Sequence, residues 1–237
     1  MKEHFQKRIN FCVTLKLDCR FVVIEGHAPK GDHSMQFLCD AMLEEYLSEQ
    51  EIVDYSYPLI QDILHQLCDS EDSETERIKR TYEFVRDVVH HSSDIRGIRV
   101  TCAASEVLTY KEGLCYAKSH LLAALLRAQG IPTGFCYQRL LLGSTPAEGY
   151  VLHGLNAVFL SSENRWIRLD ARGNKPGIQA EFSTEAEQLA YVVQPALGEI
   201  DYPTIYAQPH PIVIKALREH TNCLDLCEHF LPDQLSV

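Results

Sequence analysis

The feature that most constrains the fold is a strong helix signal followed directly by a strand pattern. Residues 114–129 are rich in Leu and Ala, and Gly130 and Pro132 are typical of a helix end. Beyond them, apolar residues alternate with a period of two, which predicts strands over residues 135–142, 152–160 and 166–170. Because helices precede an antiparallel sheet, the sequence predicts an α+β fold.

The chain before this helix is also predicted to be helical. Ser73 and Glu76 form a capping-box pattern, and apolar residues follow at helical spacing over 74–90. Apolar residues at the same spacing predict further helices over residues 37–43, 58–67, 103–110 and 212–230.

Length and composition fit one globular domain. The 237 residues are 46% hydrophobic and 23% charged, which excludes a disordered chain. We expect residues 35–237 to form a single domain. Residues 1–34 are either a hairpin on this domain or an upstream extension, and the sequence leaves both possibilities open, as it does the oligomeric state.

The charge and the cysteines of the chain indicate which partners and which cellular compartment to expect. The net charge of −11 argues against nucleic acid and anionic membrane as partners. No apolar run approaches 18 residues, so no membrane-spanning helix is expected. Charges are scattered through the N-terminal residues, which is unlike a secretory signal, and the nine cysteines follow no regular spacing. We therefore expect a cytoplasmic protein with reduced thiols.

Cys115 lies at the start of the strongest predicted helix. The N–H groups of a first helical turn have no partner within the helix, and the helix dipole is positive there. Both effects stabilise a thiolate and lower the pKa of a cysteine, which a cysteine nucleophile requires. The same N–H groups are suited to binding an oxyanion.

His153 and Asp170 are the predicted partners of Cys115. His120 is nearer in sequence, but it lies about 140° around the helix from Cys115. A two-residue loop after position 160 would pair His153 directly with Asp170. A four-residue loop through Asn164 would place the two residues diagonally on one face, whereas three or five residues would separate them. Asp170 would orient His153, and His153 would accept the thiol proton.

Three sequence segments carry a resemblance to a known family. ASEVL at 104–108, GLC at 113–115 and LLAALLRAQGIP at 121–132 resemble the core of the transglutaminase-like superfamily. In that family a cysteine heads a helix that ends in a Gly-Ile-Pro turn, a histidine begins a later strand, and an aspartate ends the next strand. The resemblance extends over about residues 55–182. It differs where Tyr116 replaces a common tryptophan and where Gly-Leu, not Ala-Trp, follows His153.

The resemblance implies a papain-like fold, with the cysteine helix packed on an antiparallel sheet, and a Cys-His-Asp triad of Cys115, His153 and Asp170. It implies thiol-dependent acyl transfer on a peptide or protein amide, as in a cysteine peptidase or amide hydrolase that needs no cofactor. The alternatives are transfer of the acyl group to an amine, and a catalytically silent domain that binds peptides or protein partners.

Four further residues are expected near the substrate. His91 precedes the cysteine and is a possible oxyanion donor, and Trp166 would form a wall of the cleft unless it belongs to the core. Arg172 would bind a substrate carboxylate, and Asn174 would reach the cleft, unless both lie in a solvated turn.

The sequence predicts no metal site. His220, Cys223, Cys227 and His229 lie close together in the sequence, but their spacing matches no zinc template. Amphipathic packing of a helix explains the two cysteines equally well.

Overall fold

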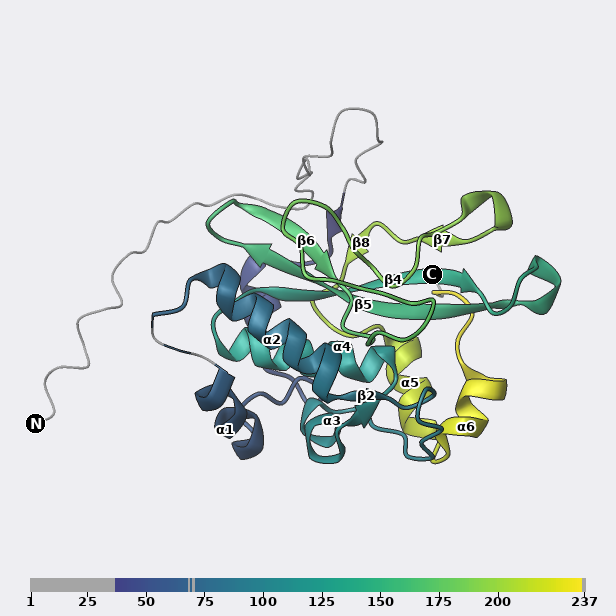
Figure 1. Ribbon diagram of the computed structural model, residues 1–237, viewed down its shortest axis with the longest axis horizontal. Coiled ribbons are helices and arrows are strands. Elements are labelled where there is room, and N and C mark those ends of the chain that lie inside the picture. Colours follow the sequence, from purple (N-terminus) through teal and green to yellow (C-terminus); the bar gives the residue numbers. More distant parts are fainter. Residues whose placement is uncertain (1–36, 68, 70, 236–237) are drawn as a thin grey trace, which may run out of the picture.

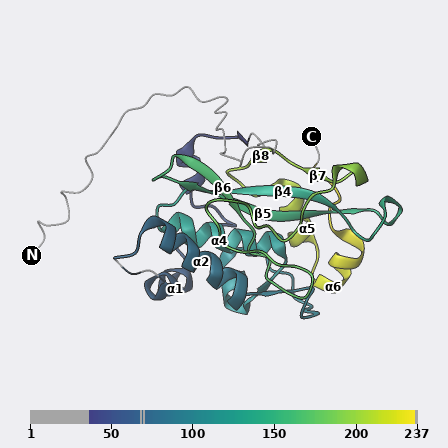
Figure 2. The same cartoon turned by 45° about the horizontal axis from the view of Figure 1, so that its top comes forward.

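The computed structural model describes residues 37–67, 69 and 71–235 (Figure 1). The predictions for residues 1–34 lie outside this part of the chain. The predicted α+β class is confirmed, because helices cover one side of an antiparallel sheet in both views (Figure 2).

The helical layer follows the predicted order. It comprises α1 (Pro58–Leu67), α2 (Glu74–Val88), α3 (Ala104–Tyr110) and α4 (Cys115–Ala128). The capping box of α2 forms as predicted: Glu76 N–H donates to Ser73 Oγ, and Ser73 N–H donates to the Glu76 carboxylate. Helix α4 is buried at every position from Tyr116 to Arg127, so it forms the centre of the molecule.

The main sheet has the strand order β6-β5-β4-β7 and is antiparallel throughout. Its strands are β4 (Thr133–Leu141), β5 (Tyr150–Leu160), β6 (Arg165–Leu169) and the short β7 (Ile200–Asp201). Phe159 pairs with Trp166, which is the register of a four-residue β5–β6 loop. Asn164 in this loop has a positive φ of 50°, a conformation that asparagine tolerates better than most residues.

Two pairs of very short parallel strands complete the structure. Strand β2 (His90–His91) pairs with β3 (Glu112–Gly113), and β1 (Leu38–Cys39) pairs with β8 (Thr204–Ile205). The remaining short helices are η1 (Leu43–Leu47), η2 (Pro146–Glu148), η3 (Pro195–Leu197), α5 (Pro211–Glu219), α6 (Cys223–Asp225) and the π-helix η4 (Leu226–Phe230).

Two predicted helices are wrong in part. Residues 37–43 contain β1 instead of a helix, because the N–H groups of Leu38 and Asp40 donate to the carbonyls of Pro203 and Ile205 in the β8 segment. The C-terminal helix is interrupted between α5 and α6. Asn222 has extended backbone there, and its side chain accepts hydrogen bonds from two N–H groups at the start of α6. It therefore starts a new helix instead of continuing α5.

Side chains on the two faces of the sheet form two cores. Val158 and Ile167 face α4 and belong to the larger core. Their strand neighbours Phe159 and Trp166 point to the other face and pack with Tyr46. Within the described part of the chain, no helix has the length and apolar character needed to span a membrane.

Candidate active site

Backbone pairing places Cys115 at the edge of a pocket. Strand β3 ends at Gly113, Leu114 is the N-cap of α4, and Cys115 is its first residue. The Leu114 side chain has no acceptor atom and makes no capping hydrogen bond, so the N-cap residue leaves the first-turn N–H groups of α4 uncapped. Cys115 is half-buried and lines a pocket of about 830 Å³.

Helix α4 approaches the sheet most closely beside His153. Gly154 has no side chain, and a Cβ at this position would lie 2.7 Å from Cδ1 of Tyr116. The Tyr116 hydroxyl donates to the Leu152 carbonyl. Glycine at 154 therefore allows the residue after Cys115 to pack against the strand that carries His153. Tyr116 and Gly154, at both of which the sequence departs from the family pattern, are thus in contact with each other.

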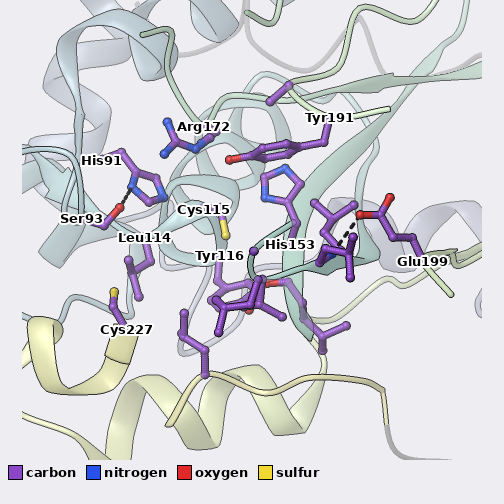
Figure 3. A pocket seen from close by; sticks show the side chains of 18 of the residues that line it. His91, Ser93, Leu114, Cys115, Tyr116, His153, Arg172, Tyr191, Glu199 and Cys227 are labelled. Atoms are coloured by element: carbon purple, nitrogen blue, oxygen red, sulfur yellow. Dashed lines mark hydrogen bonds between the residues drawn. The ribbon is translucent and has the colours of Figure 1, made fainter. Parts of the chain in front are cut away.

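His153 and Asp170 form a buried hydrogen-bonded pair. Nε2 of His153 lies 2.8 Å from Oδ2 of Asp170, and both side chains are at most 5% exposed. Strand β6 ends at Leu169, so Asp170 is the first residue beyond it and reaches diagonally across to β5. With Nε2 bound to Asp170, the Nδ1 nitrogen is left for the thiol; Figure 3 shows the imidazole beside Cys115.

The surroundings of His153 and Asp170 favour the charged forms of both side chains. Burial disfavours an imidazolium, but the Asp170 carboxylate and the Cys115 sulfur outweigh burial and raise the pKa of His153 to about 10. Burial also acts against the Asp170 anion. The His153 charge and two backbone N–H donors, from Arg172 and Ala190, nevertheless lower the pKa of this carboxyl below its usual value.

Tyr191 covers the imidazole of His153. The two rings meet edge to face, with centroids 5.0 Å apart (Figure 3). Tyr191 belongs to the irregular segment between β6 and η3, which has no periodic pattern from which its position could be predicted. It supplies the aromatic neighbour that the sequence lacks directly after His153, and it limits the access of water to the His153–Asp170 pair.

His91 lies in the wall of the same pocket. The β2–β3 pairing sets it opposite Gly113, two residues before Cys115. Nδ1 of His91 lies 2.9 Å from Oγ of Ser93, and Figure 3 shows the ring between Ser93 and Cys115. Burial lowers the pKa of His91 to about 3, and the nearby Arg172 cation acts in the same direction. The imidazole is therefore neutral, and Nε2 carries its proton if Ser93 donates to Nδ1.

The structure locates the three other residues expected near the substrate. The guanidinium of Arg172 lines the pocket and makes two hydrogen bonds to Asp94, of 2.8 and 2.9 Å, so its expected contact with a substrate carboxylate stays a prediction. The Asn174 side chain instead bonds Ala180 and braces its own loop. Trp166 does not line the pocket, because it packs with Tyr46 and Phe159 in the smaller core.

A buried lysine lies on α4, one turn after Cys115. Lys118 has no exposed surface, and its ammonium group donates to the carbonyls of Arg86 and Val89 at the C-terminal end of α2. Burial lowers its pKa to about 7, and Arg172 adds to this effect. Lys118 therefore links the cysteine helix to the segment that leads into His91.

Two further expectations from the sequence concern His120 and the cysteines near the C-terminus. His120 is buried, and its Nδ1 lies 2.8 Å from the Cys102 carbonyl, away from Cys115, as the helical spacing predicted. The sulfur atoms of Cys223 and Cys227 are 3.9 Å apart. Among the residues that the structure describes, no three metal-binding side chains are grouped so that they could hold an ion.

Comparisons with known proteins agree with this geometry. Residues 61–171 match the family model of the transglutaminase-like superfamily. No curated protein matches the sequence.

Several solved structures are similar to this chain. One is a proposed cysteine protease from Cytophaga hutchinsonii, with 17% identity and a TM-score of 0.45 over 55% of this chain and 42% of that one. Another is a proposed protease from Parabacteroides distasonis, with 13% identity and a TM-score of 0.34 over 53% and 25% of the chains. A TGase has 18% identity and a TM-score of 0.37 over 61% and 42%. The chain thus covers less than half the length of each.

The family match ends at residue 171, directly after Asp170, and includes Cys115, His153 and the sheet between them. These are the segments in which the cysteine helix, the histidine strand and the following aspartate meet in the structure. The chain therefore contains a transglutaminase-like domain over residues 61–171.

Proposed function

We propose that this protein is a thiol-dependent acyl-transfer enzyme that cleaves a peptide or other amide bond. The observation that carries the proposal is the 2.8 Å contact of His153 with Asp170, buried beside the thiol of Cys115 in the wall of one pocket. A histidine that serves only the core needs neither a carboxylate partner nor a cysteine at a helix start.

The first half of the mechanism is acylation of Cys115. His153 accepts the thiol proton, and the sulfur attacks the carbonyl carbon of the amide. The resulting oxyanion is stabilised by the first-turn N–H groups of α4 and by Nε2–H of His91. The imidazolium of His153 then donates its proton to the departing amine, while Asp170 keeps the ring oriented.

The second half releases the acyl group. Water attacks the thioester with His153 as general base, the carbon–sulfur bond breaks, and the thiol is restored. We propose hydrolysis rather than transfer to an amine, because the charged side chains in the pocket wall are already bonded within the protein. Among the residues that line the pocket, Glu199 is the carboxylate that could hold an ammonium acceptor, and it already accepts two backbone N–H groups.

The test is the rate of iodoacetamide labelling at Cys115 between pH 5 and 9, measured by peptide mass spectrometry. In the parent we expect fast labelling that persists below about pH 7, because the His153 imidazolium stabilises the thiolate. His153→Ala should slow labelling at pH 6 by about tenfold or more. His65→Ala is the matched control, because His65 is exposed on α1 and does not line the pocket.

Two results would count against the proposal. Cys115 would label no faster than the buried Cys102 and Cys136, whose pKa values burial raises to about 11 and about 12. Alternatively, His153→Ala would label as fast as the parent at pH 6. Either result would leave a domain that binds through the pocket without using the thiol.

A further inference from the structure

The pocket continues from the triad into an apolar groove. Val151 and Leu152 precede His153 on β5, and Leu140 and Leu142 come from the strand end paired with this part of β5. Leu197 of η3 and Leu231, after η4, complete the lining. The apolar groove, as we call these six residues, is continuous with the wall that holds Cys115 and His153.

The groove is accessible to a ligand. Leu140 and Leu152 are buried, whereas Leu142 is 57% exposed at its rim. Val192, which also lines the pocket beside Tyr191, is 85% exposed. Large apolar side chains around a pocket lower the free energy when a ligand removes them from water.

The charged side chains that line the pocket near the groove are Arg172 and Glu199, and both already make hydrogen bonds within the protein. Arg172 makes a two-bond contact with Asp94. Glu199 accepts from the N–H groups of Leu141 and Gln194, at 2.9 and 2.6 Å. A charged substrate group would lose hydration here and would have to compete with these bonds for a partner.

From these observations we infer that the substrate carries a bulky, uncharged, apolar group next to the scissile amide, of the size of a leucine side chain, and that the apolar groove binds it. This inference rests on the proposed function, because it takes Cys115 to be the nucleophile. It adds the chemical class of the substrate, which the triad itself does not determine.

The test uses iodoacetamides that differ only in the group on nitrogen. N-isopentyl-iodoacetamide is compared with the neutral, polar N-(3-hydroxypropyl)-iodoacetamide and with the anionic N-(2-carboxyethyl)-iodoacetamide. Rates at Cys115 are divided by the rates with 2-mercaptoethanol, which removes differences in intrinsic reactivity. We expect the isopentyl reagent to react about tenfold faster than the hydroxypropyl reagent, because the groove buries its methyl groups.

Two variants connect the preference to the groove. Leu142→Asp places a carboxylate at the rim and should reduce the isopentyl advantage to about twofold or less. Leu43→Asp is the matched control, because Leu43 is 40% exposed on η1 and does not line the pocket. It should keep the parent ratio. Circular dichroism spectra of both variants establish that they are folded.

The outcomes separate this inference from the proposed function. If Cys115 labels fast and depends on His153, but the normalised rates are equal for all three reagents, the inference is wrong and the proposed function stands. If Leu142→Asp keeps the full isopentyl preference, the inference is also wrong. If the parent Cys115 is not activated toward unsubstituted iodoacetamide, the proposed function itself fails.

Discussion

His91 and His153 lie beside the same thiol, yet their neighbours favour opposite protonation states. His153 faces the Asp170 carboxylate, and its pKa is raised to about 10 in spite of burial. His91 is half-buried in the pocket wall near Arg172, and desolvation together with the Arg172 cation lowers its pKa to about 3. Titratable groups whose surroundings separate their pKa values take different roles in catalysis. His153 is therefore suited to carry a proton, and His91 to remain a neutral hydrogen-bond donor.

This difference leads to a prediction for His91. His91→Leu removes a donor to the oxyanion and should slow acylation by p-nitrophenyl acetate about 100-fold, measured as the burst of nitrophenolate. Labelling by iodoacetamide should change by no more than a few-fold, because alkylation at carbon forms no oxyanion. His91→Gln, which keeps an N–H donor, should recover part of the acylation rate. Equal losses in both reactions would mean that His91 only supports the structure around Cys115.

Among individual residues, those that could be predicted from the sequence are the ones that a motif or a strand register locates. Cys115 is marked by its helix start, and the even number of residues in the β5–β6 loop was sufficient to place His153 and Asp170 on one face. Tyr191 was missed because it reaches the site from an irregular segment. The pairing of Arg172 with Asp94 was missed because the two residues are 78 positions apart in the chain.

At the scale of elements, the contact between α4 and β5 sets the distance between thiol and imidazole. Gly154→Ala would bring a Cβ to 2.7 Å from the Tyr116 ring and to 3.4 Å from its Cα. The clash is with the ring of Tyr116, which is buried and held by the hydrogen bond of its hydroxyl to the Leu152 carbonyl, so the ring cannot move aside without displacing α4 or β5. The two halves of the proposed triad would then move apart.

We therefore expect Gly154→Ala to destabilise the fold by about 1–3 kcal/mol in urea unfolding and to slow labelling of Cys115 at pH 6. Gly97→Ala is the control, because its Cβ would meet mainly the carboxylate end of Glu112, which can rotate aside. A Gly154→Ala protein with parent stability and parent labelling would show that the α4–β5 contact adapts without affecting the site.

The elements that sequence reasoning identified are those with long, regular patterns. The helix over 74–90 and the strand over 152–160 match α2 and β5 closely, because each repeats its period several times. Strands β1, β7 and β8 have two residues each, which is too short for any period to be detected. They are specified by tertiary pairing, such as the Tyr46 hydroxyl that donates to the Ile205 carbonyl.

At the scale of the whole molecule, two buried groups give stability opposite dependences on pH. The folded state raises the pKa of His153 to about 10, so the folded protein holds a proton that the unfolded chain releases above about pH 6.5. Lys118 behaves in the opposite way. Its pKa is lowered to about 7, so the unfolded chain holds a proton that the folded protein has lost. The two effects oppose each other between about pH 7 and pH 10.

A comparison with His153→Gln isolates the histidine contribution. Asp170 has a lowered pKa and stays ionised throughout this range, so the stabilisation by the His153–Asp170 pair is fully present near pH 6 and is lost as pH rises toward 10. The free energy of unfolding in urea should therefore favour the parent over His153→Gln by at least about 1 kcal/mol more at pH 6 than at pH 9. The exposed His65→Gln should show no such change between the two pH values. A difference that is constant with pH, or that grows toward pH 9, would mean that His153 is neutral in the folded protein, and the thiol would then lack the cation that its activation requires.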